Sequence, residues 1–265
     1  MPLWVPQKGA MLRQNNYGNV GSLTVGTSVT TGAGTSTKTS PMTQLIASTE
    51  FDAYAILITA TGYGSPATLS RGCLDIGIGA ATEEVLISNL LMGQCGSIAA
   101  VDPGGWKSWW FPLYIPAGTR IAAATAGIRT STACFVGVEI YGGHGYPPWR
   151  VGNRAITYGI GTVPAGTTTT PGASAAEGAW AQVTNSTTEP CFCIVPSAQA
   201  GSADTTLTAS GVWMDIATGA AAAEELIADG GRQHSFVFGL TGSEIISGPI
   251  NSFPLFADIP SGTAL

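Results

Sequence analysis

Two aspartates in hydrophobic stretches, each followed by a pair of glutamates, have the residue types of an acid–base site. Asp75 lies in CLDIGIGAATEE and Asp215 in WMDIATGAAAAEE. Paired carboxylates catalyse hydrolysis, and Asp75 with Glu83 and Glu84 would also suit calcium. No partner base accompanies either aspartate, and the arrangement occurs twice. We therefore expect structural aspartates that satisfy the backbone of adjacent turns, with no catalytic residue, metal site or cofactor.

The histidines and the glycine-rich stretch give no support to an enzyme. His144 and His234 lie far apart, and neither has the Ser–Asp or Cys partner that nucleophilic catalysis requires. Gly77 and Gly79 in GIGAAT lack the third glycine and the βαβ setting of a dinucleotide-binding loop. We interpret them as a turn or bulge.

The cysteines are too few and too irregularly spaced for a disulfide framework or a zinc site. Their odd number leaves at least one thiol without an internal partner, and we expect buried free thiols that act as small apolar side chains. The alternative is an intersubunit disulfide from Cys191 or Cys193, which lie two positions apart and so share one face of a strand. The cysteines are Cys73, Cys95, Cys134, Cys191 and Cys193.

An aromatic cluster in GGWKSWWFPLYIPAGTRIA is the clearest candidate for a binding surface. Trp106, Trp109 and Trp110 precede a Pro-Ala-Gly-Thr turn, and Tyr146 and Trp149 follow in GYPPWR. We expect the three tryptophans to pack against Tyr146 and Trp149, or against another subunit. The alternative is a contact with a glycan, because flat rings suit sugar faces and exposed aromatic side chains favour interfaces.

The same series of patterns occurs in both halves of the chain. TEFDAYAILI, CLDIGIGAATEEVLI and FPLYIPAGTRI are followed, in the same order, by TEPCFCIV, WMDIATGAAAAEELI and FPLFADIPSGTAL. Ordered self-similarity at a nearly constant offset indicates two tandem copies of one domain. The matched pairs lie 139 to 142 residues apart: Glu50 with Glu189, Asp75 with Asp215, and Phe111 with Phe253.

The repeat divides the aromatic cluster into two parts. The FPL and IPxGT patterns recur, so we assign them to the fold that both copies share. Asn251 and Ser252 stand where the first copy has Trp109 and Trp110. The tryptophans therefore belong to the first copy alone.

The repeat also predicts the domain boundaries and an incomplete second copy. After IPAGT the first copy continues with two expected strands, 120–126 and 133–141, whereas the second copy has no such strands before Leu265. Either the natural chain continues, or a neighbouring chain supplies the strand at an open sheet edge. We prefer continuation, because an exposed half-sheet favours aggregation. The expected parts are an N-terminal arm (1–13), the first copy (14–143), a linker (144–151) and the second copy (152–265).

Alternating, β-branched and aromatic stretches separated by Gly, Pro and Ser predict an all-β fold. We expect two tandem jelly-roll-like antiparallel β-sandwich domains. Only ATEEVLISNLLM and AAAEELIADG have any helical character, and we read the first of these as a strand.

The composition indicates a surface made for contact with other subunits. Charged residues make up 10% of the chain, against about 25% in typical soluble proteins, so little charge repulsion keeps molecules apart. The net charge of −6 and the scattered basic residues disfavour nucleic-acid binding. We find no apolar stretch long enough to span a membrane and no signal peptide, and we expect synthesis in the cytoplasm.

The segments CLDIGIGAATEEVLISNLL and WFPLYIPAGTRIAA resemble repeated domains in structural proteins of tailed bacteriophages and prophages. The likeness covers more of the first copy than of the second. It implies a β-rich virion component, made in the host cytoplasm, and carries over no catalytic residue.

We therefore expect a non-enzymatic virion structural protein that decorates the head or forms part of a collar, tail or fibre. Its partners would be other virion proteins and copies of itself in a homo-oligomer. The alternative is a receptor-binding module of a tail fibre that contacts a host surface glycan. A third reading, a polysaccharide depolymerase, requires carboxylates clustered in a groove.

Overall fold

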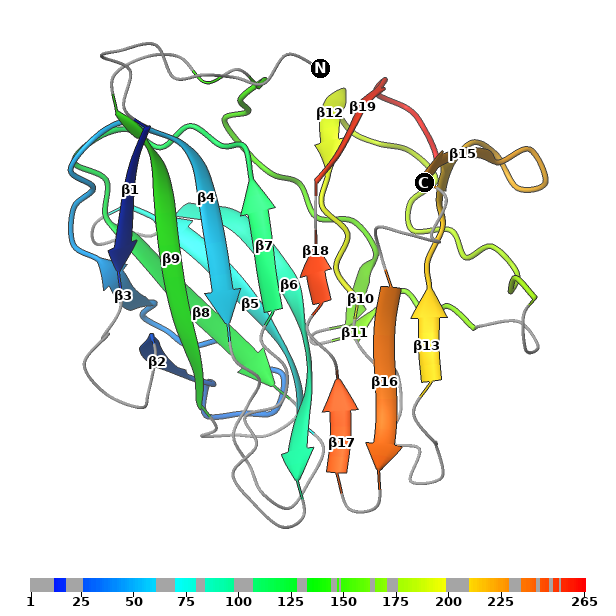
Figure 1. Cartoon of the computed structure of the whole chain (residues 1–265), viewed down its shortest axis with the longest axis horizontal. Helices are drawn as coiled ribbons and strands as arrows, with labels where there is room; N and C mark the ends of the chain where they lie inside the picture. The colour runs from blue at the N-terminus through cyan, green and yellow to red at the C-terminus, as the bar shows by residue number, and fades with distance from the viewer. Residues whose placement is uncertain are drawn as a thin grey trace.

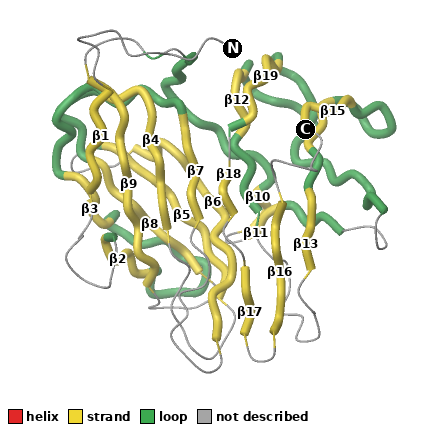
Figure 2. The backbone as a smooth tube through the Cα atoms, in the orientation of Figure 1, coloured by secondary structure: helices red, strands yellow, loops and turns green. Residues whose placement is uncertain are grey.

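The computed structural model is all-β, with two larger sheets and three two-stranded sheets among the described residues (Figures 1 and 2). Its strand pairs are antiparallel except for one. The described residues are 12–17, 26–60, 70–79, 84–97, 107–127, 133–143, 147, 149–162, 165–170, 176–198, 210–228, 235–241, 244–247, 250–252 and 254–265.

The first large sheet has six strands in the order β1-β9-β4-β7-β18, with β2 also paired to β9. The short strand β18 runs parallel to β7 and extends this sheet with residues from the second half of the chain. The strands are β1 (Leu12–Tyr17), β2 (Thr27–Thr30), β4 (Ala53–Ala60), β7 (Lys107–Phe111), β9 (Ala133–Gly143) and β18 (Ile250–Ser252).

The second large sheet has seven strands in the order β13-β16-β17-β6-β5-β8-β3. Its β17 pairs with the end of β6, so this sheet also joins the two halves of the chain. The strands are β3 (Thr43–Ile46), β5 (Ser70–Ile78), β6 (Glu84–Ser97), β8 (Ile121–Gly127), β13 (Ser210–Trp213), β16 (Ser235–Thr241) and β17 (Glu244–Ser247).

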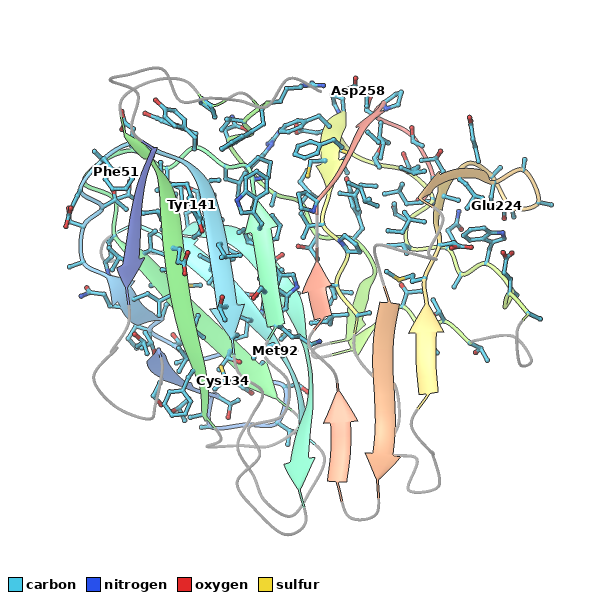
Figure 3. The ribbon with its side chains drawn as sticks, in the orientation of Figure 1. Phe51, Met92, Cys134, Tyr141, Glu224 and Asp258 are labelled. Carbon is cyan, nitrogen blue, oxygen red and sulfur yellow. The ribbon has the colours of Figure 1, made fainter. Side chains whose placement is uncertain are left out.

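The core lies between β1-β9-β4-β7 and β3-β8-β5-β6, which pack face to face (Figure 1). Every second residue of β9 is buried, as expected for a strand with one face on a core. Met92 and Cys134, both labelled in Figure 3, lie in this core. Its fully buried side chains include Val29, Ile56, Ile58, Leu74, Ile76, Ile87, Trp109, Ile115, Ile121 and Ile140.

Three small two-stranded sheets complete the described structure, and all belong to the second half of the chain. They are β10 (Ile160–Thr162) with β11 (Ala165–Gly166), β12 (Cys191–Ile194) with β19 (Leu255–Ile259), and β14 (Ile216–Thr218) with β15 (Glu225–Ala228).

The prediction of an all-β, antiparallel fold is confirmed, and the expected strands 120–126 and 133–141 coincide closely with β8 and β9. ATEEVLISNLLM contributes to β6, and AAAEELIADG contributes to β15. The expected arm and first copy meet inside β1, which pairs with β9. Strands β13, β16, β17 and β18 of the second half continue the sheets of the first half.

Candidate assembly surface

The turn after Phe111 is closed by Thr49, which is 3% exposed. The Thr49 hydroxyl donates to the Pro116 carbonyl at 2.7 Å and accepts from the Thr119 N–H at 3.0 Å. The Thr49 backbone pairs with Thr119 O at 2.9 Å and with Gly118 N at 2.8 Å. Gly118 has a φ of +80°, which glycine adopts without strain.

The same contacts close a second turn near the C-terminal end of the sequence. Thr187 is 2% exposed, and its hydroxyl donates to Pro260 O at 2.8 Å and accepts from Thr263 N at 3.1 Å. Its backbone pairs with Thr263 O at 2.8 Å and with Gly262 N at 2.7 Å. Gly262 has a φ of +81°. Each of these four hydrogen bonds of Thr49 therefore has a counterpart at Thr187.

The strands beside the two turns pair in the same register. In each half the register slips by one residue between an outer pair and an inner pair, as at a β-bulge. The pairs are Ala53 with Ile115 and Ile56 with Phe111 in the first half, and Cys191 with Ile259 and Ile194 with Leu255 in the second.

The β5–β6 and β14–β15 hairpins match in the same way. Gly79 and Gly219 both have positive φ values, and their N–H groups donate to Arg120 O and Ala264 O at 3.3 and 3.2 Å. In the first hairpin the pairs are Ile76 with Ile87, Gly77 with Val85 and Ile78 with Glu84. In the second hairpin the corresponding pairs are Ile216 with Ala228, Ala217 with Leu226 and Thr218 with Glu225.

These registers refine the residue matches expected from the sequence. Asp75 and Asp215 stay matched, because they directly precede the matched Ile76 and Ile216. The sequence match of Glu50 with Glu189 is shifted by one residue, since Thr49 corresponds to Thr187. The match of Phe111 is shifted by two residues, to Leu255. Positions 253 and 254, and not the expected Asn251 and Ser252, therefore correspond to Trp109 and Trp110. Phe253 itself lies outside the described residues.

The second framework is less covered than the first. Strand β9 flanks β4, and β8 flanks β5. Within the described residues, β12 pairs only with β19, and β14 only with β15. Ile56 and Ile76 are 0% exposed, whereas the corresponding Ile194 and Ile216 are partly exposed.

Large apolar side chains are exposed around this framework. Phe256 on β19 is 56% exposed and Leu226 on β15 is 55% exposed. Val85, which corresponds to Leu226, is also exposed, at 46%. Trp180 and Val183 are also exposed, at 47% and 40%. Exposed apolar side chains mark surfaces that contact other molecules where they gather into one patch.

The aromatic cluster divides at β7, where alternate side chains point inward. Trp109 is 1% exposed and belongs to the core. The neighbouring Trp110 points to the other face, where its ring meets Trp149 edge to face at 5.5 Å and Phe256 at 6.5 Å. Trp106 and Tyr146 lie outside the described residues.

The aromatic junction, defined as Trp110, Trp149 and Phe256, connects the linker to both halves of the chain. The guanidinium of the adjacent Arg150 lies 4.8 Å from the ring centre of Phe192 on β12. Arg150 also pairs with Asp258, which Figure 3 labels on β19. Of the tryptophans expected to pack against the linker, Trp110 contacts Trp149, whereas Trp109 lies in the core.

Lys107 is a buried cation that sequence reasoning overlooked. It is 3% exposed, and its ammonium donates to Leu91 O at 2.9 Å and to Ala198 O at 2.7 Å. Burial lowers the pKa of Lys107 to about 7. Ser197 Oγ accepts from Leu91 N at 2.9 Å. These bonds attach the segment after β12 to β6.

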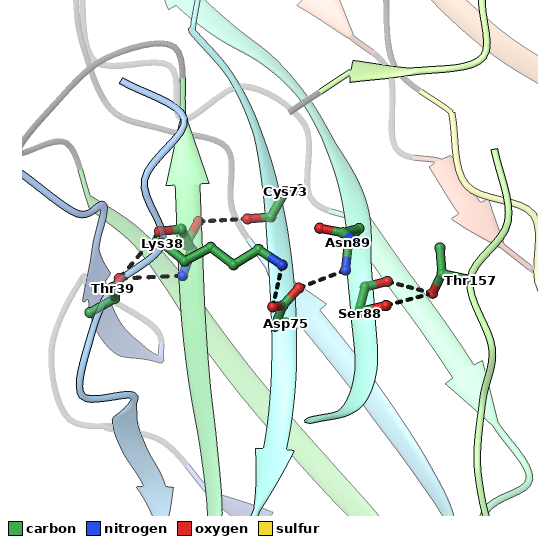
Figure 4. A network of polar contacts seen from close by, with 8 residues as sticks. Lys38, Thr39, Cys73, Asp75, Ser88, Asn89 and Thr157 are labelled. Carbon is green, nitrogen blue, oxygen red and sulfur yellow. Dashed lines mark hydrogen bonds and ion pairs between the residues drawn. The ribbon is translucent and has the colours of Figure 1, made fainter. Parts of the chain in front are cut away.

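Asp75 is 2% exposed, and its carboxylate holds neighbouring segments of the chain together (Figure 4). Its carboxylate accepts from Lys38 Nζ at 2.5 Å and from the Asn89 backbone N–H at 2.6 Å. Asn89 has a φ of 55°, so the carboxylate supports an unusual backbone conformation in β6. Glu83, the expected calcium partner, lies outside the described residues. In the described part of the chain, no three His, Cys, Asp or Glu side chains group as metal ligands.

The cysteines that the structure describes are free thiols. Cys73 and Cys134 are buried, and Cys191 and Cys193 are half-buried on β12. Burial raises the pKa of Cys191, and burial together with the nearby Cys191 raises the pKa of Cys193 to about 12. The Cys95 side chain lies outside the described residues.

Comparison of the chain with protein-family models, curated proteins and solved structures finds no significant match. The described residues include no helix with the length and apolar character needed to cross a membrane.

Proposed function

We propose that the chain is a virion structural protein of the tailed-bacteriophage type that works by assembly with other subunits. The observation that carries this proposal is the exposure of large apolar side chains around β12, β14, β15 and β19. Phe256 and Leu226 are each more than half exposed. Burying one such side chain stabilises a contact by about 1.5 to 3 kcal/mol, and interfaces are enriched in aromatic residues.

The low charge of the chain supports the same proposal. Only 10% of the residues are charged, and a surface with few charges makes contact between subunits less costly. In the virion the protein would decorate the head or form part of a collar, tail or fibre. Its partners would be copies of itself and other virion proteins.

The finer fold that we propose is a tandem pair of jelly-roll-like β-sandwich domains. The matched turns at Thr49 and Thr187 support it, as do the matched one-residue register slips between β4 and 111–115 and between β12 and β19. The second domain shares sheets with the first through β17 and β18. We therefore treat the two copies as one assembling unit.

The alternative, a module that binds a host surface glycan, has less support. Trp109 is buried at 1% exposure and offers no face to a sugar. Trp110 and Trp149 pack on each other and on Phe256. A groove lined with carboxylates, as a depolymerase requires, is not supported by Asp75 either, since this side chain is buried against Lys38.

The proposal is tested by light scattering of the purified full chain over a range of concentrations. We expect oligomers whose population rises with concentration. The double variant Leu226→Ser and Phe256→Ser should shift the chain towards the monomer, while Tyr114→Ser, a change at another exposed aromatic residue, should not. A chain that stays monomeric at high concentration, alone and with other virion proteins, would contradict the proposal.

A further inference from the structure

We infer that the folded chain joins Lys38 to Asp75 by an amide bond between their side chains. This link goes beyond the proposed function, because it forms within one chain and does not depend on assembly. Leu74 and Ile76 belong to the core, so Asp75 between them lies on the opposite face of β5. There the bond ties the segment 31–42, which follows β2, to the second large sheet.

The two reacting groups are already in contact. Lys38 Nζ lies 2.5 Å from Asp75 Oδ2, one bond away from the carbon that the nitrogen attacks (Figure 4). Groups held in such contact react far faster than the same groups free in solution. The Asp75 side chain is 3% exposed, whereas that of Lys38 is 32% exposed, which leaves a route by which a released water can depart.

The backbone on both sides of Lys38 is fixed to β8, the strand beside β5. Ser36 N donates to Gly127 O at 2.8 Å, and Thr39 N donates to Thr125 O at 3.1 Å. The Thr39 hydroxyl also accepts from Thr125 N at 3.3 Å. Because Lys38 lies between these two attachments, its side chain stays directed at Asp75 without a further loss of conformational freedom.

A backbone N–H is directed at the second oxygen of the carboxylate. Asn89 N donates to Asp75 Oδ1 at 2.6 Å. When an amine adds to the carboxyl carbon, negative charge develops on this oxygen, and a donor fixed in this position stabilises it. Asn89 adopts a φ of 55° inside β6, a conformation that is costly in a strand and that is concentrated at functional sites.

Asn89 also carries an acceptor that the ion pair leaves unused. Its Oδ1 is buried and has no hydrogen-bond partner, although buried polar atoms are nearly always paired. The atom belongs to the residue that holds the carboxylate. We assign it to the proton that the amine or the acid carries while the bond forms.

The reaction needs no other reactant. The Lys38 ammonium passes one proton to Oδ2 of Asp75, which gives an amine and a carboxylic acid. The amine lone pair forms a bond to the carboxyl carbon, and the charge moves to Oδ1. As the C=O bond re-forms, the bond to Oδ2 breaks, and Oδ2 leaves as water with a second proton from the nitrogen. The products are one amide and one water, and the cost of a buried charge is removed.

The repeat supplies a comparison within the same chain. Asp215 corresponds to Asp75, but the second copy (152–265) contains no lysine. The amide is therefore a property of the first copy alone. The lysines of the whole chain are Lys8, Lys38 and Lys107, so a linked peptide can be assigned without ambiguity.

Mass spectrometry of the purified full chain tests the inference. The intact mass should be lower than the sequence mass by one water molecule. Trypsin does not cleave after an acylated lysine, so digestion should yield residues 14–71 joined to residues 72–107. Fragmentation of this product should place the link between Lys38 and Asp75.

A matched pair of variants gives the control. Lys38→Arg keeps the positive charge beside Asp75, but a guanidinium stays protonated and does not attack a carboxyl group. This variant should have its full sequence mass and be cleaved at position 38. Lys8→Arg makes the same exchange at another lysine and should still lose one water.

Two results would overturn the inference. One is a wild-type chain that keeps its full mass after prolonged incubation at 37 °C and is cleaved completely after Lys38, which would leave the pair as an ion pair only. The other is a loss of water that persists in Lys38→Arg, which would assign the loss to another site. Neither readout depends on whether the chain oligomerises, so the proposed function is tested separately by light scattering.

Discussion

Thr49 and Thr187 make the same set of hydrogen bonds in two turns that lie far apart in the sequence. Each hydroxyl donates to a proline carbonyl and accepts from a threonine N–H, at distances of 2.7 and 3.0 Å in one turn and 2.8 and 3.1 Å in the other. Both threonines are almost completely buried. The two halves of the chain thus fold around a shared local framework.

The first prediction concerns this pair. Thr49→Val and Thr187→Val keep the side-chain shape but remove the hydroxyl that joins a proline carbonyl to a threonine N–H. The carbonyls of Pro116 and Pro260 still accept from the hydroxyls of Thr119 and Thr263. Each change should therefore lower the free energy of unfolding by about 0.5 to 1.5 kcal/mol. Urea unfolding of both variants measures the loss. Thr49→Ser and Thr187→Ser retain the hydroxyl and should keep most of the stability that the valine variants lose. A valine variant as stable as the parent would refute the role assigned to the hydroxyl.

The second prediction concerns pH. The pKa of Lys107 is about 7 in the folded chain, against 10.5 ordinarily. Between these values the unfolded chain binds more protons, so the free energy of unfolding should rise with pH, by at most about 1.4 kcal/mol per unit. Above pH 9 the thiols of Cys73, Cys134 and Cys193 oppose this rise. Burial raises their pKa values to between about 11 and about 12, so the unfolded chain loses protons first.

Urea unfolding between pH 7 and pH 10 should therefore show greatest stability near pH 9. Lys107→Met, which keeps the length and removes the charge, should flatten the rise between pH 7 and pH 9. It should leave the fall above pH 9 intact. A rise of the same size in the variant would show that another group causes it.

The third prediction separates the neighbouring tryptophans. Trp109→Ala opens a cavity in the core and should cost about 3 to 5 kcal/mol. Trp110→Ala removes edge-to-face contacts at the aromatic junction and should cost less. A double-mutant cycle of Trp110 with Trp149 should give a coupling of about 0.5 to 1.5 kcal/mol. Equal losses for the two single variants would contradict their different placement.

The fourth prediction concerns the thiols of β12. With a pKa of about 12, Cys193 is almost entirely protonated at pH 8, and the thiolate is the reactive form. Its alkylation by iodoacetamide should be about a thousandfold slower than that of a free cysteine. Mass spectrometry of the peptide that contains Cys193 follows the reaction. A rate close to that of free cysteine would show that the thiol is neither buried nor raised in pKa.

The intersubunit disulfide from Cys191 or Cys193 stays a prediction. Non-reducing electrophoresis of the assembled protein, with each cysteine changed to Ser in turn, measures it directly.

Local patterns in the sequence were sufficient to predict most strands of the first copy. The alternation in CFVGVEIYG predicts β9, and Gly and Pro residues in the sequence indicate where the neighbouring strands end. The matched turns follow from the repeated IPxGT pattern. These features depend on residues close together in the chain, where side-chain periodicity carries the information.

Long-range pairing could not be predicted in this way. No local signal shows that β17 pairs with β6 or that β18 lies beside β7, because the partners are far apart in sequence. The sequence also left open which of Trp109 and Trp110 is buried, since only the position of β7 decides which side chains point inward. Lys107 shares the inward face with Trp109 and Phe111, and that spacing was the signal that could have revealed it.

Electron cryo-microscopy of the chain assembled with its partners tests the central claim most directly. We predict that Phe256 and Leu226 are buried against a neighbouring subunit. A particle whose subunits meet elsewhere, with these side chains in solvent, would contradict the account.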